Sequence, residues 1–171
     1  MFWNLDKPDT SPETWEPKLR GKRADTKAIA YIPNERTVVV GLDGEIVFLN
    51  RDTQEQIGAL PPLGAPALGC KVTSDGKLLV VLCQNELSLW RLADKSLVAK
   101  MSLAGITVNQ INFSPDGRFV AVATGWQLPT SPREVRVWST AEGNLLHTFH
   151  GHKGIVRAVF FSPDCTRAIS A

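Results

Sequence analysis

The chain has 171 residues, of which 43% are hydrophobic and 21% charged, and its formal net charge is only +2. So small a charge provides no field that would favour nucleic acid or a membrane surface, and no apolar run approaches the roughly 20 residues of a membrane-spanning helix. The three cysteines are too few and too scattered for a disulfide framework. We therefore expect a globular protein without a membrane segment, in a reducing, cytoplasmic compartment by default.

Residues 1–22 differ in character from the rest of the chain. They are polar and contain Pro8, Pro12 and Pro17, a composition that favours loop structure. Residues 2–6 are an exception, because they fit the end of a short strand. We expect residues 1–22 to hold the end of one structural unit and a linker to the next.

Short segments with alternating apolar and polar residues recur along the rest of the chain, and turn residues separate them. Alternation of period two is typical of β-strands, and no apolar stripe of helical period is long enough for a helix. The sequence therefore predicts an all-β fold. The expected strands include residues 37–40, 45–49, 56–60, 78–83, 87–90, 97–101, 111–113, 118–124, 135–138 and 145–149.

One short motif recurs at a regular interval. Its clear copies are residues 111–117, which end in Ser-Pro-Asp-Gly, and residues 159–165, where Cys165 replaces the glycine. Two altered copies lie at residues 70–76 and 29–35. The steps between Asn34, Asp75, Asp116 and Asp164 are 41, 41 and 48 residues. A period of roughly 40 to 45 residues is typical of repeats that each form one small sheet.

A second mark has the same period. An aromatic residue closes a short apolar strand at Phe48, Trp90 and Trp138, in steps of 42 and 48 residues. Each repeat holds four short segments of strand character, joined by tight turns. The two marks together predict a chain of four-stranded antiparallel units.

These marks resemble WD40 repeats, through Gly151-His152, residues 161–164 and the strand-terminal Trp90 and Trp138. The resemblance covers the chain from about residue 20 onward. It implies a β-propeller, in which four-stranded blades pack face to face around a central channel. The expected blades are residues 23–64, 65–106 and 107–150, with half a blade in residues 151–171, so that residues 1–22 are the end of a preceding blade and a linker.

The sequence departs from the pattern of that family at the polar positions. The aspartate of the family's Trp-Asp pair is missing, since Ser139 follows Trp138, Arg91 follows Trp90 and Leu49 follows Phe48. The family's Gly-His pair occurs once. We therefore expect packing, more than polar networks, to stabilise the blades.

The length predicts an incomplete ring. Seven blades of about 42 residues would need about 290 residues, and the chain has 171. One interpretation is a piece of a longer propeller. The other is that the N-terminal strand residues complete the C-terminal half blade, within one chain or between two. An open propeller would leave unpaired strand edges, which favour association or aggregation.

Candidate catalytic and metal-binding groups have a simpler interpretation. His147, His150 and His152 lie close in sequence, and imidazole is a common metal ligand. However, His147 falls in an expected strand, and His152 matches the family's structural Gly-His. Asp75, Asp116 and Asp164 fall in turns, where aspartate bonds to its own backbone. We expect no catalytic residue, no metal and no cofactor.

The most promising candidate for partner binding is the longest connection within a blade, residues 125–133. In an up-and-down sheet, this second-to-third turn lies at the same end as the link into the next blade, residues 150–153. Trp126 is a candidate anchor beside Gln127, because tryptophan and arginine dominate interface hot spots. A basic rim is expected from Arg133, Lys153 and Arg157. In the alternative interpretation, Trp126 packs on its own blade and the loop is structural.

The predicted function is a non-catalytic scaffold that presents a rigid loop face to a protein partner or to other domains of its own chain, as the resemblance implies. The alternative is a regulatory or sensor segment of a larger enzyme, such as a signalling kinase. Nucleic-acid binding is disfavoured by the low charge. It would require Lys18, Arg20, Lys22 and Arg23 to form one basic patch.

Overall fold

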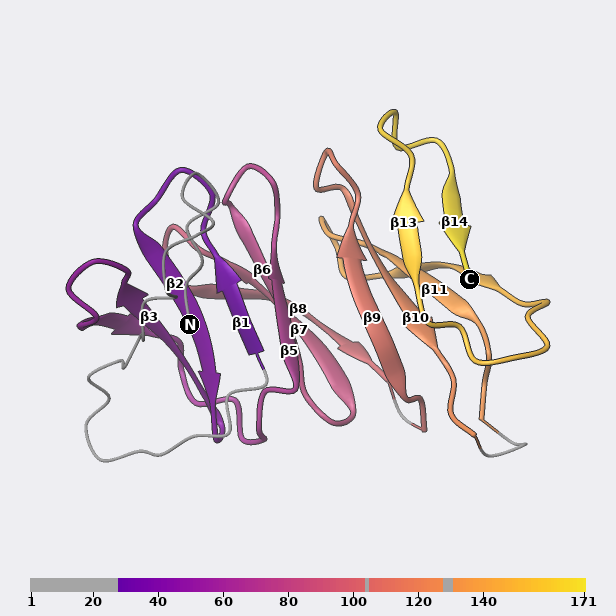
Figure 1. The fold of residues 1–171 in the computed structure, drawn as a ribbon, viewed down its shortest axis with the longest axis horizontal. Helices are drawn as coiled ribbons and strands as arrows, with labels where there is room; N and C mark the ends of the chain where they lie inside the picture. Colours follow the sequence, from indigo (N-terminus) through magenta and orange to yellow (C-terminus); the bar gives the residue numbers. More distant parts are fainter. Residues whose placement is uncertain (1–27, 104, 128–130) are drawn as a thin grey trace, which may run out of the picture.

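The computed structural model describes residues 28–103, 105–127 and 131–171. The expectations for residues 1–22, including the strand end at residues 2–6 and the basic cluster, lie outside the described residues. Over the described residues the structure is all-β, as predicted, and it holds no helix long and apolar enough to cross a membrane. Each strand expected between residues 37 and 149 overlaps an observed strand (Figure 1).

Among the described residues, the strands form three four-stranded antiparallel sheets and one two-stranded sheet, each with its strands in sequence order. The first sheet comprises β1 (Ala28–Tyr31), β2 (Thr37–Leu42), β3 (Glu45–Asn50) and β4 (Gln56–Ala59). The second comprises β5 (Gly69–Val72), β6 (Leu78–Leu82), β7 (Glu86–Arg91) and β8 (Ser96–Ser102). The third comprises β9 (Val108–Phe113), β10 (Phe119–Thr124), β11 (Val135–Ser139) and β12 (Leu145–Phe149). The last is β13 (Val159–Phe161) with β14 (Ala168–Ser170).

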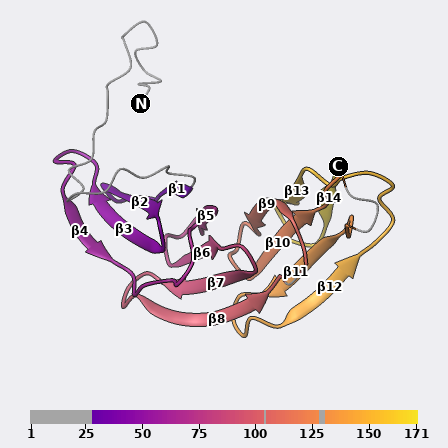
Figure 2. The ribbon, with the colours of Figure 1, turned by 90° about the horizontal axis from the view of Figure 1, so that it is seen from below.

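The sheets stand side by side in an open crescent (Figure 2). The first strand of each sheet lies on the concave side, where β1 contacts β5, β5 contacts β9 and β9 contacts β13. The fourth strands β4, β8 and β12 lie on the convex side. This arrangement is an incomplete β-propeller of three blades and a half blade, as the sequence predicted.

Apolar residues between neighbouring sheets form the core. Because side chains alternate across a strand, each sheet presents one apolar face to the sheet before it and one to the sheet after it. Phe48 and Trp90 are buried between the first and second sheets, and Trp138 between the second and third. Cys70 also belongs to this core, and burial raises the pKa of its thiol to about 12.

The half blade leaves one strand edge open. Antiparallel pairing with β13 uses one side of β14, and no described strand lies on the other side. Phe160 and Ile169 are cross-strand partners, and they are 50% and 71% exposed. The open edge is the feature that the sequence linked to association, and this exposed apolar pair lies beside it.

The turn of the half blade carries backbone strain at Cys165. Its φ is 59°, in the left-handed region, where the equivalent turns have Gly76 and Gly117 at +73°. A residue with a Cβ atom is disfavoured there by roughly 1–2 kcal/mol, partly offset by the greater freedom of glycine in the unfolded chain.

We expect Cys165→Gly to raise the free energy of unfolding by up to about 1 kcal/mol, measured by urea denaturation. Cys165→Ala is the matched control, because it removes the thiol and keeps the strain. Equal stabilisation by both variants would assign the effect to the sulfur and contradict the backbone explanation.

Candidate protein-interaction surface

The described residues of the connection between β10 and β11, 125–127 and 131–134, lie beside the link from β12 to β13, at the end of the sheets opposite the Ser-Pro-Asp turns (Figure 1). Arg133 Nη1 donates a hydrogen bond to the carbonyl oxygen of Lys153 at 2.7 Å. A Cβ atom on Gly125 would lie 3.1 Å from the Cα atom of Ile155. The fold thus brings together the two segments that the sequence placed at one end.

Hydrogen bonds hold the base of this surface. The hydroxyl of Thr124 donates to the Glu134 carbonyl oxygen at 2.8 Å and accepts from the Glu134 amide at 3.1 Å. The Asn109 side-chain amide donates to the carbonyl oxygens of Gly125 and Val156, at 3.0 and 2.9 Å. The two ends of the long connection are therefore bonded to each other, and Asn109 on the inner strand β9 holds both the Gly125 end and the link.

A buried carboxylate lies at the centre of this network. Glu134 is 5% exposed. Its Oε1 atom accepts a hydrogen bond from Arg136 Nε at 2.6 Å, and its Oε2 atom lies 3.1 Å from His150 Nδ1. A buried carboxylate needs such partners because its desolvation is costly. Sequence reasoning missed Glu134; the available signal was an acidic residue two positions before Arg136, on the same side of a strand.

The predicted partner-binding residues differ in exposure. Trp126 is 52% exposed and Gln127 is exposed. Arg133 is half-buried because its guanidinium turns toward the link, while Lys153 and Arg157 are exposed. The structure thus places an exposed aromatic side chain and two exposed cations at this end.

The three histidines have different neighbours. The His147 ring lies 5.6 Å from the Phe149 ring, His150 faces Glu134, and His152 Nε2 lies 2.8 Å from the Ser170 hydroxyl. No cluster of three potential metal ligands is present among the described residues. The pairing of His152 with Ser170 ties the Gly-His segment to the edge strand β14.

Aspartates cap the turns at the opposite end. One oxygen of Asp75, Asp116 and Asp164 accepts the backbone amide two residues later, each at 3.0 Å. The same oxygen of Asp116 accepts the Ser114 hydroxyl at 2.6 Å. This bond, with the amide of Arg118, holds the pKa of Asp116 well below its ordinary value of 3.8. Hydroxyls of Thr73 and Ser162 lower the pKa of Asp75 and Asp164 in the same way.

These carboxyl groups predict acid sensitivity. Each folded-state pKa lies below the unfolded value, so the ionised form stabilises the fold above pH about 4, and this stabilisation is lost as the pH falls through the lowered pKa. We expect the free energy of unfolding to decrease below about pH 4 and to depend less on pH in Asp116→Asn. Urea denaturation at several pH values measures this. An unchanged acid dependence in the variant would contradict the assignment to Asp116.

Comparisons with known proteins agree with this architecture. The family described as WD domain, G-beta repeat, matches residues 143–171. An uncharacterized WD repeat-containing protein of Synechocystis sp. is 30% identical over 145 residues, which cover 84% of this chain and 37% of that protein. Residues 143–171 carry a WD40 repeat. The periodic tryptophan protein 2 homolog of Dictyostelium discoideum is 23% identical over 84% of the chain and 15% of its own length. The WD40 chain thus spans well under half of the curated relatives that it matches.

Solved structures share the fold of this WD40 segment. Kuenenia stuttgartiensis hydrazine synthase superposes with a TM-score of 0.70 at 18% identity, over 85% of this chain and 43% of that one. The β-propeller domain of Cps50 (Swd1) from Myceliophteria thermophila gives 0.67 at 20% identity, over 81% and 47%. At identities this low, the superpositions establish the propeller fold and nothing about activity.

Proposed function

We propose that this WD40 segment is a non-catalytic scaffold that binds a protein partner at the end formed by residues 125–133 and 150–157. The observation that carries the proposal is Trp126, half exposed on a connection whose base is hydrogen-bonded on both sides. A rigid aromatic anchor loses little conformational entropy on binding, and tryptophan is the residue most enriched among hot spots.

The charges near Trp126 specify the chemistry of the partner. Lys153 and Arg157 are exposed and make no ion pair with a described carboxylate. Exposed cations at the rim of an interface steer an acidic partner and raise its association rate. We therefore propose a partner with an apolar cavity for Trp126 and acidic residues at its rim. Gln127 and Arg133 would supply hydrogen bonds.

The open edge of β14 supports a proposal of self-association. Unpaired strand edges with exposed apolar side chains pair readily with further strands, and Phe160 and Ile169 are exposed beside this edge. Light scattering measures the native mass of the purified chain and separates two alternatives. The mass of a dimer means that a second copy covers β14. The mass of a monomer favours a further strand of a longer chain.

The Trp126 proposal is tested by affinity purification of tagged variants from the native host, with quantitative mass spectrometry of the bound proteins. We expect Trp126→Ala to reduce recovery of the specific partner at least tenfold, since hot-spot truncations cost about 2 kcal/mol or more. Leu97→Ala is the matched control, because Leu97 is an exposed apolar residue on the outer strand β8. Equal recovery with Trp126→Ala would mean that the loop is structural only.

The same experiment separates the two functional hypotheses. Partners that are separate proteins favour the scaffold. A catalytic domain encoded in the same longer chain, with Trp126 at its contact, favours a regulatory segment of an enzyme. The likeness to hydrazine synthase is a likeness of fold and gives no preference.

A further inference from the structure

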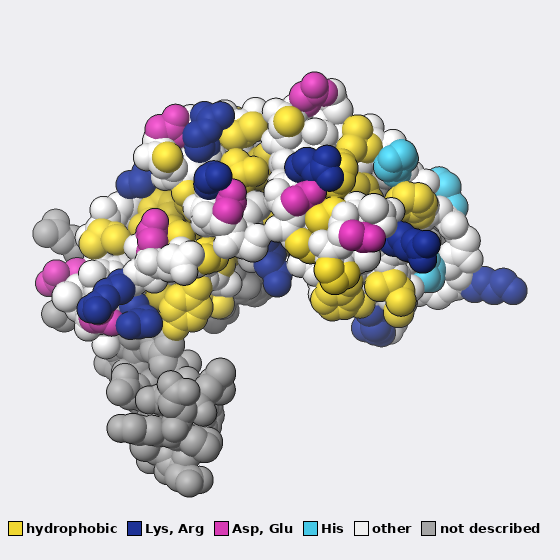
Figure 3. Space-filling model, turned by 90° about the horizontal axis from the view of Figure 1, so that it is seen from above, with side chains coloured by type: hydrophobic (Ala, Val, Ile, Leu, Met, Phe, Trp, Pro, Cys, Tyr) yellow, Lys and Arg dark blue, Asp and Glu magenta, His cyan; other side chains and the backbone are white. Residues whose placement is uncertain are grey.

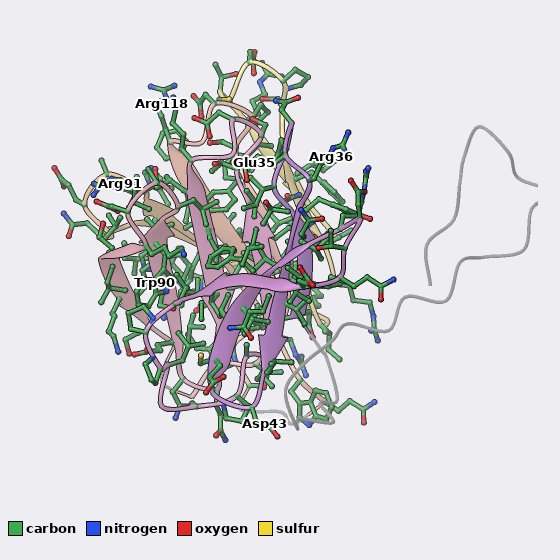
Figure 4. All side chains as sticks on the ribbon, turned by 90° about the vertical axis from the view of Figure 1, so that its left-hand side faces the viewer. Glu35, Arg36, Asp43, Trp90, Arg91 and Arg118 are labelled. Carbon is green, nitrogen blue, oxygen red and sulfur yellow. The ribbon has the colours of Figure 1, made fainter. Side chains whose placement is uncertain are left out.

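A groove lies at the end of the sheets opposite the Trp126 surface, by the Ser-Pro-Asp turns. It has a volume of about 760 Å³ and extends from the first sheet to the third. Figure 3 views this end and shows basic, acidic and hydrophobic side chains interleaved. Figure 4 shows Glu35, Arg91 and Arg118 at this end and Asp43 at the other, so the groove is remote from the proposed Trp126 surface.

Most charges that line the groove are already paired. Lys77 lies 3.3 Å from Asp75, Arg118 lies 2.5 Å from Asp116, and Arg91 lies 3.5 Å from Asp94. Such pairs neutralise one another and leave little net field. The groove is therefore poorly suited to a polyanion such as nucleic acid, which needs a run of unpaired cations.

Lys95 is the exception among the cations. It is exposed, its Nζ atom lies 5.2 Å above the ring of Phe48, and it makes no ion pair with a described carboxylate. Gly58 provides the space for it, because a Cβ atom there would collide with Lys95 Nζ. The cation–π contact fixes the ammonium group at the junction of the first two sheets while leaving its donors available.

Apolar surface lies directly beside this ammonium group. Ile57 on β4 lines the groove and is 56% exposed, and the half-buried Leu92 lines it from the second sheet. A fixed cation next to exposed aliphatic surface matches a ligand that carries a carboxylate beside an apolar side chain. Glu35, which also lines the groove and has no ion-pair partner among the described residues, limits that ligand to one negative charge.

We propose that this groove binds an extended segment of a protein that carries one acidic residue next to an aliphatic or aromatic residue. The carboxylate pairs with Lys95, and the apolar side chain packs on Ile57 and Leu92. This site goes beyond the Trp126 surface, because it lies at the other end of the sheets and recognises a charged linear segment in place of a folded partner. One WD40 segment would then connect two partners.

The test is selection of a phage-displayed random 12-residue peptide library on the purified 171-residue chain, read by deep sequencing. We expect enriched peptides with a single acidic residue adjacent to an apolar one. Lys95→Met, which keeps most of the aliphatic stem, and Ile57→Ser should each reduce their enrichment at least tenfold. Lys71→Met is the matched control, because Lys71 is exposed on β5 and does not line the groove.

A second measurement separates the groove from the Trp126 surface. Binding of the best enriched peptide, labelled with fluorescein, is followed by anisotropy. Trp126→Ala should leave the affinity of the peptide unchanged. Replacing the peptide's acidic residue by the corresponding amide should weaken binding to the wild-type chain. The same replacement should have no additional effect on binding to Lys95→Met, which already lacks the ammonium group. No enrichment, polyacidic peptides, or equal enrichment on Lys95→Met would each overturn the proposal.

Discussion

Replacing Trp90 by alanine is expected to lower the free energy of unfolding by about 3–5 kcal/mol, the range for deleting a large buried aromatic side chain. Trp90 is 6% exposed and packs between the first and second sheets with Phe48 and Leu79. Its removal leaves a cavity that two facing sheets cannot close without moving together. The measurement is urea denaturation followed by circular dichroism.

Two variants separate packing from hydrogen bonding at this position. Trp90 Nε1 donates to the hydroxyl of Ser88 at 2.9 Å, and Ser88 is itself buried. Trp90→Phe fills most of the space but removes the donor, so a smaller loss of about 1–3 kcal/mol is expected. Trp126→Ala, at the exposed tryptophan, should change stability by less than about 0.5 kcal/mol. Equal losses for the buried and the exposed tryptophan would contradict the packing described.

Gly143→Ala is expected to destabilise the protein by about 2–4 kcal/mol, from backbone strain and steric overlap together. Gly143 lies in the turn between β11 and β12 with φ +71°, and its amide donates to the Ser139 carbonyl oxygen at 2.9 Å. A Cβ atom there would collide with the Cβ atom of Ala99 on β8, in the neighbouring sheet. The turn thus approaches the second blade more closely than any side chain permits.

Gly44→Ala is the matched control for this substitution. Gly44 has φ +74°, but a Cβ atom on it would meet nothing within 4 Å. It should therefore cost only the roughly 1–2 kcal/mol of the left-handed backbone. Ala99→Gly in the Gly143→Ala background should recover the difference between the two variants. If both glycine variants lower the free energy of unfolding by the same amount, the contact between the blades does not contribute to stability.

Local chemistry explains why the repeats were predictable from the sequence. The turn at Ser114-Pro115-Asp116-Gly117 is determined within a few residues, because its serine, aspartate and glycine supply the hydrogen bonds and the positive φ that it requires. The alternating strands and the aromatic residues that close them are equally local. Four strands per repeat and an unfinished last sheet follow from these marks and their spacing.

The candidate surfaces depended partly on the arrangement of the sheets. The sequence placed residues 125–133 beside the next link, because that adjacency follows from strand order alone. It could not show that Glu134 faces His150, that Lys95 lies over Phe48, or that Gly143 meets Ala99. These contacts join different strands, connections or sheets, so they depend on how far and at what angle neighbouring elements pack.

The sequence by itself thus determined the all-β fold, the repeat period and the capped turns, since each results from backbone and side-chain groups a few residues apart. Only the tertiary structure decided which side chains are buried between sheets, that Lys95 lies over Phe48, and which apolar side chains remain exposed. The physical reason is that these contacts form between sheets, where residues about 40 positions apart in sequence become neighbours.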